Sequence, residues 1–267
     1  MKSYLSVFKL RLITGMQYRI AAIASIFTQL SFGFIFIMIF DAFYSSNPSI
    51  QPISFNELVT YTWLKQAFLF FIMPWFRDGE IFNLITKGNI AYELCRPINL
   101  YGFWYSKLIA SRVSNTLLRC LPVLCISFIL PKPYNISLPI DLSTFSLFCI
   151  SLILGLVITV AISMLMYISV FITMSPAGSS LVFCVLGEFF SGLAIPIPLM
   201  PTWLQRIVYV LPFRLTCDMP FRIYLGHIPK NKALTGILIQ FIWLTILLIL
   251  GQVIMKKTLK KVIVQGG

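Results

Sequence analysis

The sequence predicts an all-α integral membrane protein with six transmembrane helices, and three observations support this fold class. Among its 267 residues, 58% are hydrophobic and only 11% are charged, whereas a soluble domain carries roughly a quarter of charged residues. The mean hydropathy is +0.90. The apolar residues also gather in blocks of about twenty, the length of a helix that crosses roughly 30 Å of hydrocarbon. A chain with so few charges could not cover a surface that faces water.

The first 19 residues are basic and precede the first long apolar block. In a helix, Tyr4, Phe8 and Leu12 would share one apolar stripe, with polar residues opposite. This mixture is typical of a helix that lies in the membrane interface, so we expect residues 1–19 to form an interfacial helix. No small-residue cleavage site follows the first apolar block, which therefore reads as an uncleaved first span.

Six apolar segments are candidate membrane spans. They cover residues 20–40, 57–76, 113–130, 144–174, 179–195 and 234–254. The fourth would measure about 46 Å as a helix, so we expect it to tilt or to project into the cytoplasm at one end. The breaker residues Ser175–Gly178 separate it from the fifth span.

The segment between the last two spans, residues 196–232, is interrupted by several prolines. It also carries four charged residues in its middle part: Arg206, Arg214, Asp218 and Arg222. Proline at this density ends a membrane helix. Because the segment is too polar for a span that faces lipid and too apolar for an ordinary loop, we expect a re-entrant helical hairpin. It would dip back into the outer leaflet before the last span.

The distribution of Lys and Arg predicts the orientation. If the N-terminus is cytoplasmic, thirteen of the 21 basic residues flank the spans on the cytoplasmic side and six lie outside. Cytoplasmic flanks are enriched in basic residues, so we expect a multi-pass protein of the inner or plasma membrane with both termini in the cytoplasm. These flanks also account for the net charge of +13, and nucleic acid is therefore not an expected partner.

Motifs for catalysis and metal binding are missing from the sequence. The six cysteines form no C-x-x-C pair and there is a single histidine, which argues against a metal site. There is no G-x-x-x-x-G-K-[ST], no H-E-x-x-H and no G-x-S-x-G. We therefore predict that the chain is not an enzyme and holds no cofactor of its own. The energy for transport would come from a partner or a gradient.

The loop between the second and third spans, residues 77–112, is the longest predicted cytoplasmic segment. Within it, Ile81, Leu84 and Ile85 have the spacing of a short amphipathic helix that docks on a protein. Charged residues flank these apolar positions: Asp78 and Glu80 precede them, and Glu93 and Arg96 follow them. A solvated connector is the alternative interpretation of this loop.

Three charged residues lie well inside predicted spans, away from their first and last residues. Lys65 lies near the centre of the second span, where a charge costs about 2.5–3.5 kcal/mol or more, so we expect it to face a wet cavity or a protein partner. Glu188 lies late in the fifth span, beside Gly187. Both are candidate substrate-path residues, with a purely structural role as the alternative. Arg119 lies a third of the way into the third span, and we expect it to snorkel to the interface.

Three segments of the chain resemble a known family. One resembles the fifth span and re-entrant region of ABC-2 type exporter permeases, and it includes Phe190–Gly192, Pro196, Pro201–Leu204, Leu211–Phe213, Pro220 and Arg222–Gly226. The loop Tyr92–Leu100 is similar to the "L-x-R-P" loop of the viologen-exporter-like branch, although Cys95 stands where that branch usually has an aliphatic residue. The opening Tyr4–Lys9 is similar to the N-terminal helix of the same branch.

The resemblance implies one transmembrane domain over residues 1–267 that serves as the permease subunit of an ATP-binding-cassette exporter. Two permease chains, identical or different, would pair with a cytoplasmic ABC ATPase dimer that binds ATP and Mg²⁺. The interfacial helix and residues 78–97 would pass ATPase closure to the spans through Asp78, Glu80, Glu93 and Arg96. Spans one, two and five would line the path of an amphiphilic substrate. Glu188 matches an acidic position near the hairpin of many relatives.

Two other classes of function stay open from the sequence alone. A carrier driven by a gradient would have more intramembrane carboxylates and inverted repeats, and a membrane scaffold or immunity protein would need no coupling loop. The aromatic content suits a lipophilic cation, although packing against lipid explains most of these side chains. Lys65 points instead toward anionic lipids or peptides. A neighbouring ATPase gene would favour the exporter.

Overall fold

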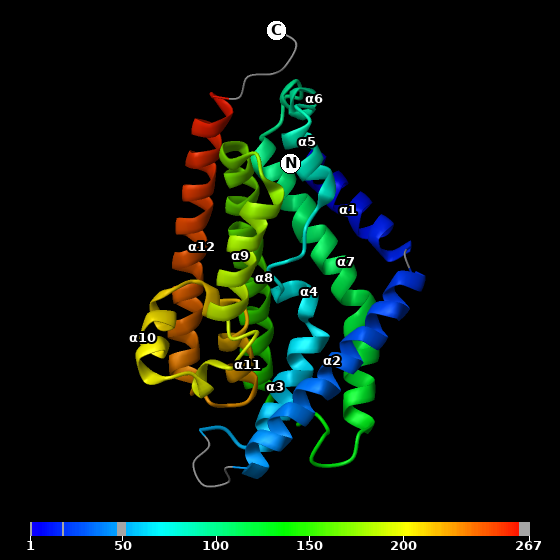
Figure 1. Cartoon of the computed structure of the whole chain (residues 1–267), viewed down its shortest axis with the longest axis vertical. Helices are drawn as coiled ribbons and strands as arrows, with labels where there is room; N and C mark the ends of the chain where they lie inside the picture. Colours follow the sequence, from blue (N-terminus) through cyan, green and yellow to red (C-terminus); the bar gives the residue numbers. More distant parts are fainter. Residues whose placement is uncertain (1, 18, 47–51, 262–267) are drawn as a thin grey trace.

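The computed structural model describes residues 2–17, 19–46 and 52–261, and these residues form helices and loops without any strand (Figure 1). Within them, four helices are long and apolar enough to cross a membrane: α2 (Arg19–Ser46), α7 (Leu100–Ile129), α8 (Leu142–Thr173) and α12 (Lys230–Leu259). Of the most apolar window of α8, 61% is buried, against 17% for α2 and 22% for α12. Helix α8 is therefore the central helix, and the other elements pack around it.

The second predicted span is a broken helix. It consists of α3 (Phe55–Ala67) and α4 (Leu69–Ile72), which are separated at Phe68, a residue with φ −103° and ψ 20°. Helix α4 ends because Pro74 follows: proline lacks an N–H group and drives the preceding residue out of the helical region. Met73 accordingly has φ −65° and ψ 129°.

The fifth predicted span is helix α9 (Pro176–Phe190), which has 15 residues. It ends five residues earlier than predicted, since Gly192 adopts a positive φ of 83°. Glycine takes this conformation without the steric cost that other residues meet. Gly187 lies against Pro74, because a Cβ at this glycine would be 2.7 Å from the proline Cβ. Helix α9 thus packs directly on the segment that ends the broken second span.

Helix α7 begins earlier than the sequence predicted. Residues 100–112 were expected in a cytoplasmic loop, but the helix runs without a break from Leu100, where the Asn99 side chain accepts a hydrogen bond from the Gly102 N–H at 3.1 Å. The loop prediction failed because Lys107 and Arg112 looked like solvated charges. Both are buried and bonded to neighbouring elements, as described below.

Helix α1 (Lys2–Gln17) packs along the first half of α7 (Figure 1). A Cβ at Gly15 would lie 2.2 Å from the Ser114 hydroxyl, so the two backbones approach closely. The Asn99 N–H donates to the Tyr4 hydroxyl at 3.2 Å. Leu5 and Leu10 on the other side of α1 are 70% and 64% exposed. Such an apolar outer face is what a helix at a membrane interface needs.

The C-terminal turns of α8 contact α5 and the start of α7. The helix has 32 residues, or about 48 Å at 1.5 Å per residue. Near its end, Tyr167 contacts Phe82 of α5 (Gly79–Thr86) with ring centroids 4.9 Å apart. Phe171 stacks on Trp104 of α7. The end of α8 therefore supports α5 and the start of α7.

The segment between α9 and α12 folds back against the long helices. It contains η1 (Ile197–Leu199), α10 (Thr202–Val210), η2 (Phe213–Leu215) and α11 (Asp218–Tyr224). A Cβ at Gly155, near the middle of α8, would lie 3.0 Å from the Thr216 carbonyl oxygen. Gln240 of α12 donates to the carbonyls of Leu215 and Ser151, at 2.8 and 3.0 Å. The segment is thus fastened halfway along α8, away from the helix ends.

Candidate functional site

One end of the molecule carries α5 and α6 (Ile90–Leu94), together with the start of α1 and the end of α12 (Figure 1). Four charged side chains link α5 to α1 and to α7. Lys107 of α7 bonds to Glu80 at 2.8 Å and to Asp78 at 3.0 Å. Arg11 of α1 also pairs with Glu80. We call these four residues the charge hub; two acids and two bases make it neutral.

The charge hub fixes the position of α5. Asp78 is the N-cap of this helix, because its carboxylate accepts hydrogen bonds from the N–H groups of Glu80 and Ile81 at 2.9 and 3.3 Å. The N–H of Asp78 donates to the Tyr167 hydroxyl of α8 at 2.6 Å. The hydrogen bond from Lys107, with that from Arg11, lowers the pKa of Glu80 below its usual range. The carboxylate is therefore charged at neutral pH.

The apolar face of α5 docks on the chain itself. Ile81 and Ile85 are 0% and 4% exposed and pack in one cluster with residues of α7 and α8. The sequence predicted an amphipathic helix that docks on a protein, and the helix is present. Its hydrophobic face is already covered by the same chain, so α5 is the base of the loop.

The tip of the loop is α6, and it is exposed. Tyr92 and Leu94 are 74% and 41% exposed. The Glu93 carboxylate pairs with Arg96 at 3.2 Å, and the Glu93 side chain is 12% exposed against 55% for Arg96. The predicted coupling residues thus divide into two pairs: Asp78 and Glu80 belong to the charge hub, and Glu93 and Arg96 hold the shape of the tip.

Arg112 connects α7 to the broken second span. It is fully buried, and one of its nitrogens donates to the carbonyls of Phe70 and Met73 at 3.0 and 2.9 Å. Its other terminal nitrogen donates to the Ser163 hydroxyl at 3.2 Å. The carbonyl of Phe70 would normally accept from the N–H four residues later, but that residue is Pro74, which has none. Arg112 supplies the missing donor.

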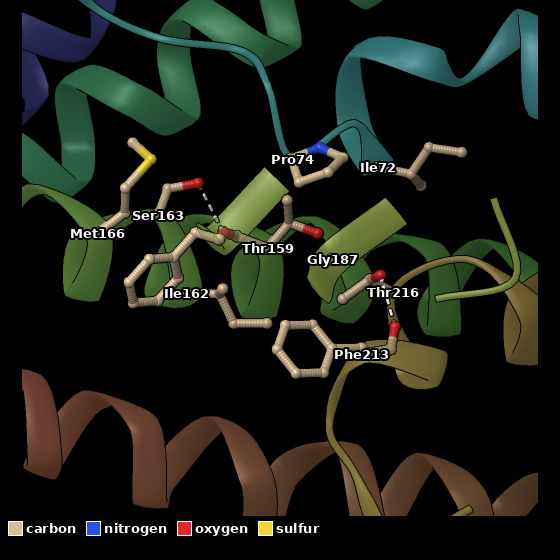
Figure 2. Close-up of a pocket in the computed structure, with 10 residues that line it drawn as sticks. Ile72, Pro74, Thr159, Ile162, Ser163, Met166, Gly187, Phe213 and Thr216 are labelled. Atoms are coloured by element: carbon tan, nitrogen blue, oxygen red, sulfur yellow. Dashed lines mark hydrogen bonds between the residues drawn. The ribbon is translucent and has the colours of Figure 1, made fainter. Parts of the chain in front are cut away.

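A small cavity of about 20 Å³ lies beside this break, among α8, α9 and η2 (Figure 2). The hydroxyls of Ser163 and Thr216 donate to the carbonyls of Thr159 and Phe213 at 2.9 and 2.7 Å. A space of this size is enough for about one water molecule. Three small polar side chains, those of Thr159, Ser163 and Thr216, thus lie among the mainly apolar lining of this cavity beside the interruption of span two.

A larger cavity of about 450 Å³ lies between α2, the broken second span and the end of α9. Both of the predicted substrate-path residues, Lys65 and Glu188, line it. The Lys65 ammonium donates to the Leu193 carbonyl at 3.0 Å and lies 4.0 Å from the centre of the Phe36 ring. We call this space the transmembrane cavity. Its volume falls in the range of sites for small molecules, about 300–1,000 Å³.

Comparison with known proteins agrees with this arrangement. Residues 21–266 match the family model described as ABC-2 family transporter protein. The chain belongs to the ABC-2 transporter family. The match begins near the start of α2 and covers every element from there to α12, including α5, α6 and the lining of the transmembrane cavity, whereas α1 with Arg11 lies before it. A comparison with curated proteins found no match.

As a member of the ABC-2 family, the chain is a membrane component of a transporter. In the parts of the chain that the structure describes, no group of three or more His, Cys, Asp or Glu could hold a metal ion.

The structural contacts of several charged residues of this ABC-2 protein were not predicted from the sequence. Arg11, Lys107 and Arg112 were counted only as basic flanks, although each bonds to another element. Arg119 does not snorkel: it is 6% exposed, donates to Asn115 at 2.7 Å and lies over the Phe70 ring. Gln29 was also not predicted, although it is a polar residue within the apolar first span, and that contrast is visible in the sequence.

Proposed function

We propose that this ABC-2 protein is the permease subunit of an ATP-driven exporter and that α6 is the element that contacts its ATPase. The observation that carries the proposal is the contrast between the two ends of the loop. The tip exposes Tyr92 and Leu94, while the base is tied by the charge hub to α1, α7 and α8. An exposed apolar tip on a rigid base suits a contact that must transmit force.

The route of coupling follows from the same bonds. Movement of the tip pulls on α5, and the charge hub passes that movement to α7. Arg112, five residues beyond Lys107 on α7, holds the end of α4. The partner ATPase dimer would bind ATP and Mg²⁺, and its closure would shift the spans between two states. Lys65 and Glu188 line the transmembrane cavity and would contact the substrate on its way outward.

We propose six crossings, made by α2, α3–α4, α7, α8, α9 and α12, with both termini in the cytoplasm. The short helices between α9 and α12 would form the re-entrant hairpin on the outer side. The contact of Thr216 with the middle of α8 supports this assignment, because a loop in water would not reach that depth. The distribution of Lys and Arg supports the orientation. The loop Tyr92–Leu100 supports the viologen-exporter-like branch.

A second permease, identical or homologous, would complete the substrate path. Helix α2, next to the transmembrane cavity, has Phe27 68% and Met38 70% exposed, and α9 has Leu181 64% exposed. A face of this kind is suited either to lipid or to a partner subunit, and the cavity that opens beside it favours the partner.

The test is affinity purification of the tagged chain in mild detergent, followed by mass spectrometry and an ATPase assay. We expect a stoichiometric ATP-hydrolysing subunit to accompany the wild type, and its recovery to fall at least tenfold for the double variant Tyr92→Ala with Leu94→Ser. The control is Leu138→Ser, an exposed leucine (75%) in the loop at the opposite end. Recovery of the chain alone from intact membranes would favour a carrier or scaffold instead.

A further inference from the structure

The transmembrane cavity contains one acidic and one basic group that attract each other electrostatically but do not contact each other directly. Within the described residues, Lys65 and Glu188 form no ion pair with one another, and the Glu188 carboxylate accepts no hydrogen bond. The Lys65 ammonium has three N–H donors, of which one is used on the Leu193 carbonyl. Each charge therefore has bonding capacity left inside an apolar surrounding.

A third polar group in the cavity, the Gln29 amide, has no hydrogen-bond partner among the described residues. Gln29 of α2 is only 2% exposed, and neither its amide nitrogen nor its amide oxygen has a hydrogen-bond partner among the described residues. An unsatisfied buried amide is costly, and native proteins rarely keep one without a reason. A ligand that offers both donors and acceptors would satisfy it.

Single-charged ligands fit this combination poorly. A lipophilic cation would compensate Glu188 and leave Lys65 facing a like charge, whereas an anion would do the reverse. Burying an uncompensated charge is strongly unfavourable, and each of these ligands leaves one. The rest of the lining is mainly apolar and aromatic, with Phe32, Phe70 and Trp75. The ligand must therefore carry an apolar body as well.

We infer that the transmembrane cavity binds a zwitterionic amphiphile, with its anionic group toward Lys65 and Gln29 and its cationic group toward Glu188. This inference rests on the proposed export function, in which the transmembrane cavity holds the substrate, but ligand binding can be measured without an ATPase. Both a zwitterionic lipid and a short hydrophobic peptide with free termini have this chemistry.

The experiment compares matched probes on the purified chain in lipid nanodiscs by titration calorimetry. Trileucine with free termini is the zwitterion, N-acetyl-trileucine is the anion and trileucine amide is the cation. Octylphosphocholine represents the lipid source of the same chemistry. We expect the wild type to bind at least one of the two zwitterions about tenfold or more tightly than either single-charged peptide. The better zwitterion then identifies the source.

Two variants make the test specific. Glu188→Gln should shift the preference toward the anion, and Lys65→Met should shift it toward the cation, whereas Lys132→Met, an exposed lysine outside the cavity, should change nothing. If Lys65 and Glu188 only stabilised the fold, each variant would weaken the binding of all probes equally. Equal affinities in the wild type, or variants that scale all probes together, overturn the inference. The copurification of an ATPase is untouched by that result, so failure of this inference and failure of the export function are distinguishable.

Discussion

Replacement of Arg112 by methionine tests how the broken second span is held. The guanidinium is fully buried and makes three hydrogen bonds: two to the carbonyls of Phe70 and Met73, and one to Ser163. Methionine keeps much of the volume but donates nothing. The end of α4 would then lose the donor that replaces the absent N–H of Pro74.

The magnitude follows from the two carbonyls. A buried acceptor without a partner costs about 1–3 kcal/mol, so two of them give about 2–6 kcal/mol. Arg112 has no carboxylate within ion-pair distance among the described residues, and removing a buried charge returns part of its desolvation cost. We therefore expect the free energy of unfolding to fall by about 2–4 kcal/mol. Lysine at this position keeps one nitrogen with three N–H donors for the two carbonyls but lacks the second nitrogen that bonds Ser163, and we expect about half of that loss.

The measurement is reversible unfolding in mixed micelles, followed by circular dichroism. Arg206→Met is the matched control, because Arg206 is exposed on α10 and should stay within about 0.5 kcal/mol of the wild type. If Arg112→Met unfolds like the wild type, the role of this residue at the break is refuted.

Three further predictions concern packing and charge. Gly155→Ala should destabilise the protein by about 1–3 kcal/mol, because the new methyl group meets the backbone of Thr216 and Leu215 at 3.0 and 3.3 Å; Gly79→Ala, with nothing within 4 Å, should be neutral in the same unfolding assay. Glu80→Gln should cost about 1 kcal/mol or less, since the side chain is 58% exposed, and the difference in Tm from the wild type should shrink in high salt. Because the pKa of Glu80 is lowered in the folded state, the contribution of this carboxylate to stability is present at neutral pH and is lost as the pH falls through the folded-state pKa. A pH titration of Tm in which the wild type and Glu80→Gln show the same acid dependence would contradict this.

The long helices could be predicted from the sequence because length and hydropathy alone determine them. The predicted segments 144–174 and 234–254 correspond to α8 and α12 within a few residues at most ends. The break in the second span was missed because Leu69–Ile72 are as apolar as the rest of the segment. Pro74 ends the helix locally, and the tertiary contact that compensates for it is not visible in the sequence: Arg112 satisfies carbonyls that an unbroken helix would have satisfied itself.

The candidate site was predictable where a charge stood out from apolar neighbours. Lys65 and Glu188 were conspicuous for that reason, and both line one cavity. Lys107 and Arg112 were not, because basic residues next to a span usually indicate the cytoplasmic side. Only the fold brings Lys107 to Asp78 and Glu80, residues 27 to 29 positions away in the chain.

The most direct test of the account places a photo-crosslinking amino acid at position 92 of the full chain, in native membranes. We expect ultraviolet light to join α6 to a protein that carries an ATP-binding cassette, with a yield that changes when ATP is added. The same probe at position 138 should give no such product. Crosslinks at position 92 to lipid alone, in membranes where the ATPase is present and the chain is intact, would contradict the assignment of α6 as the contact with the ATPase.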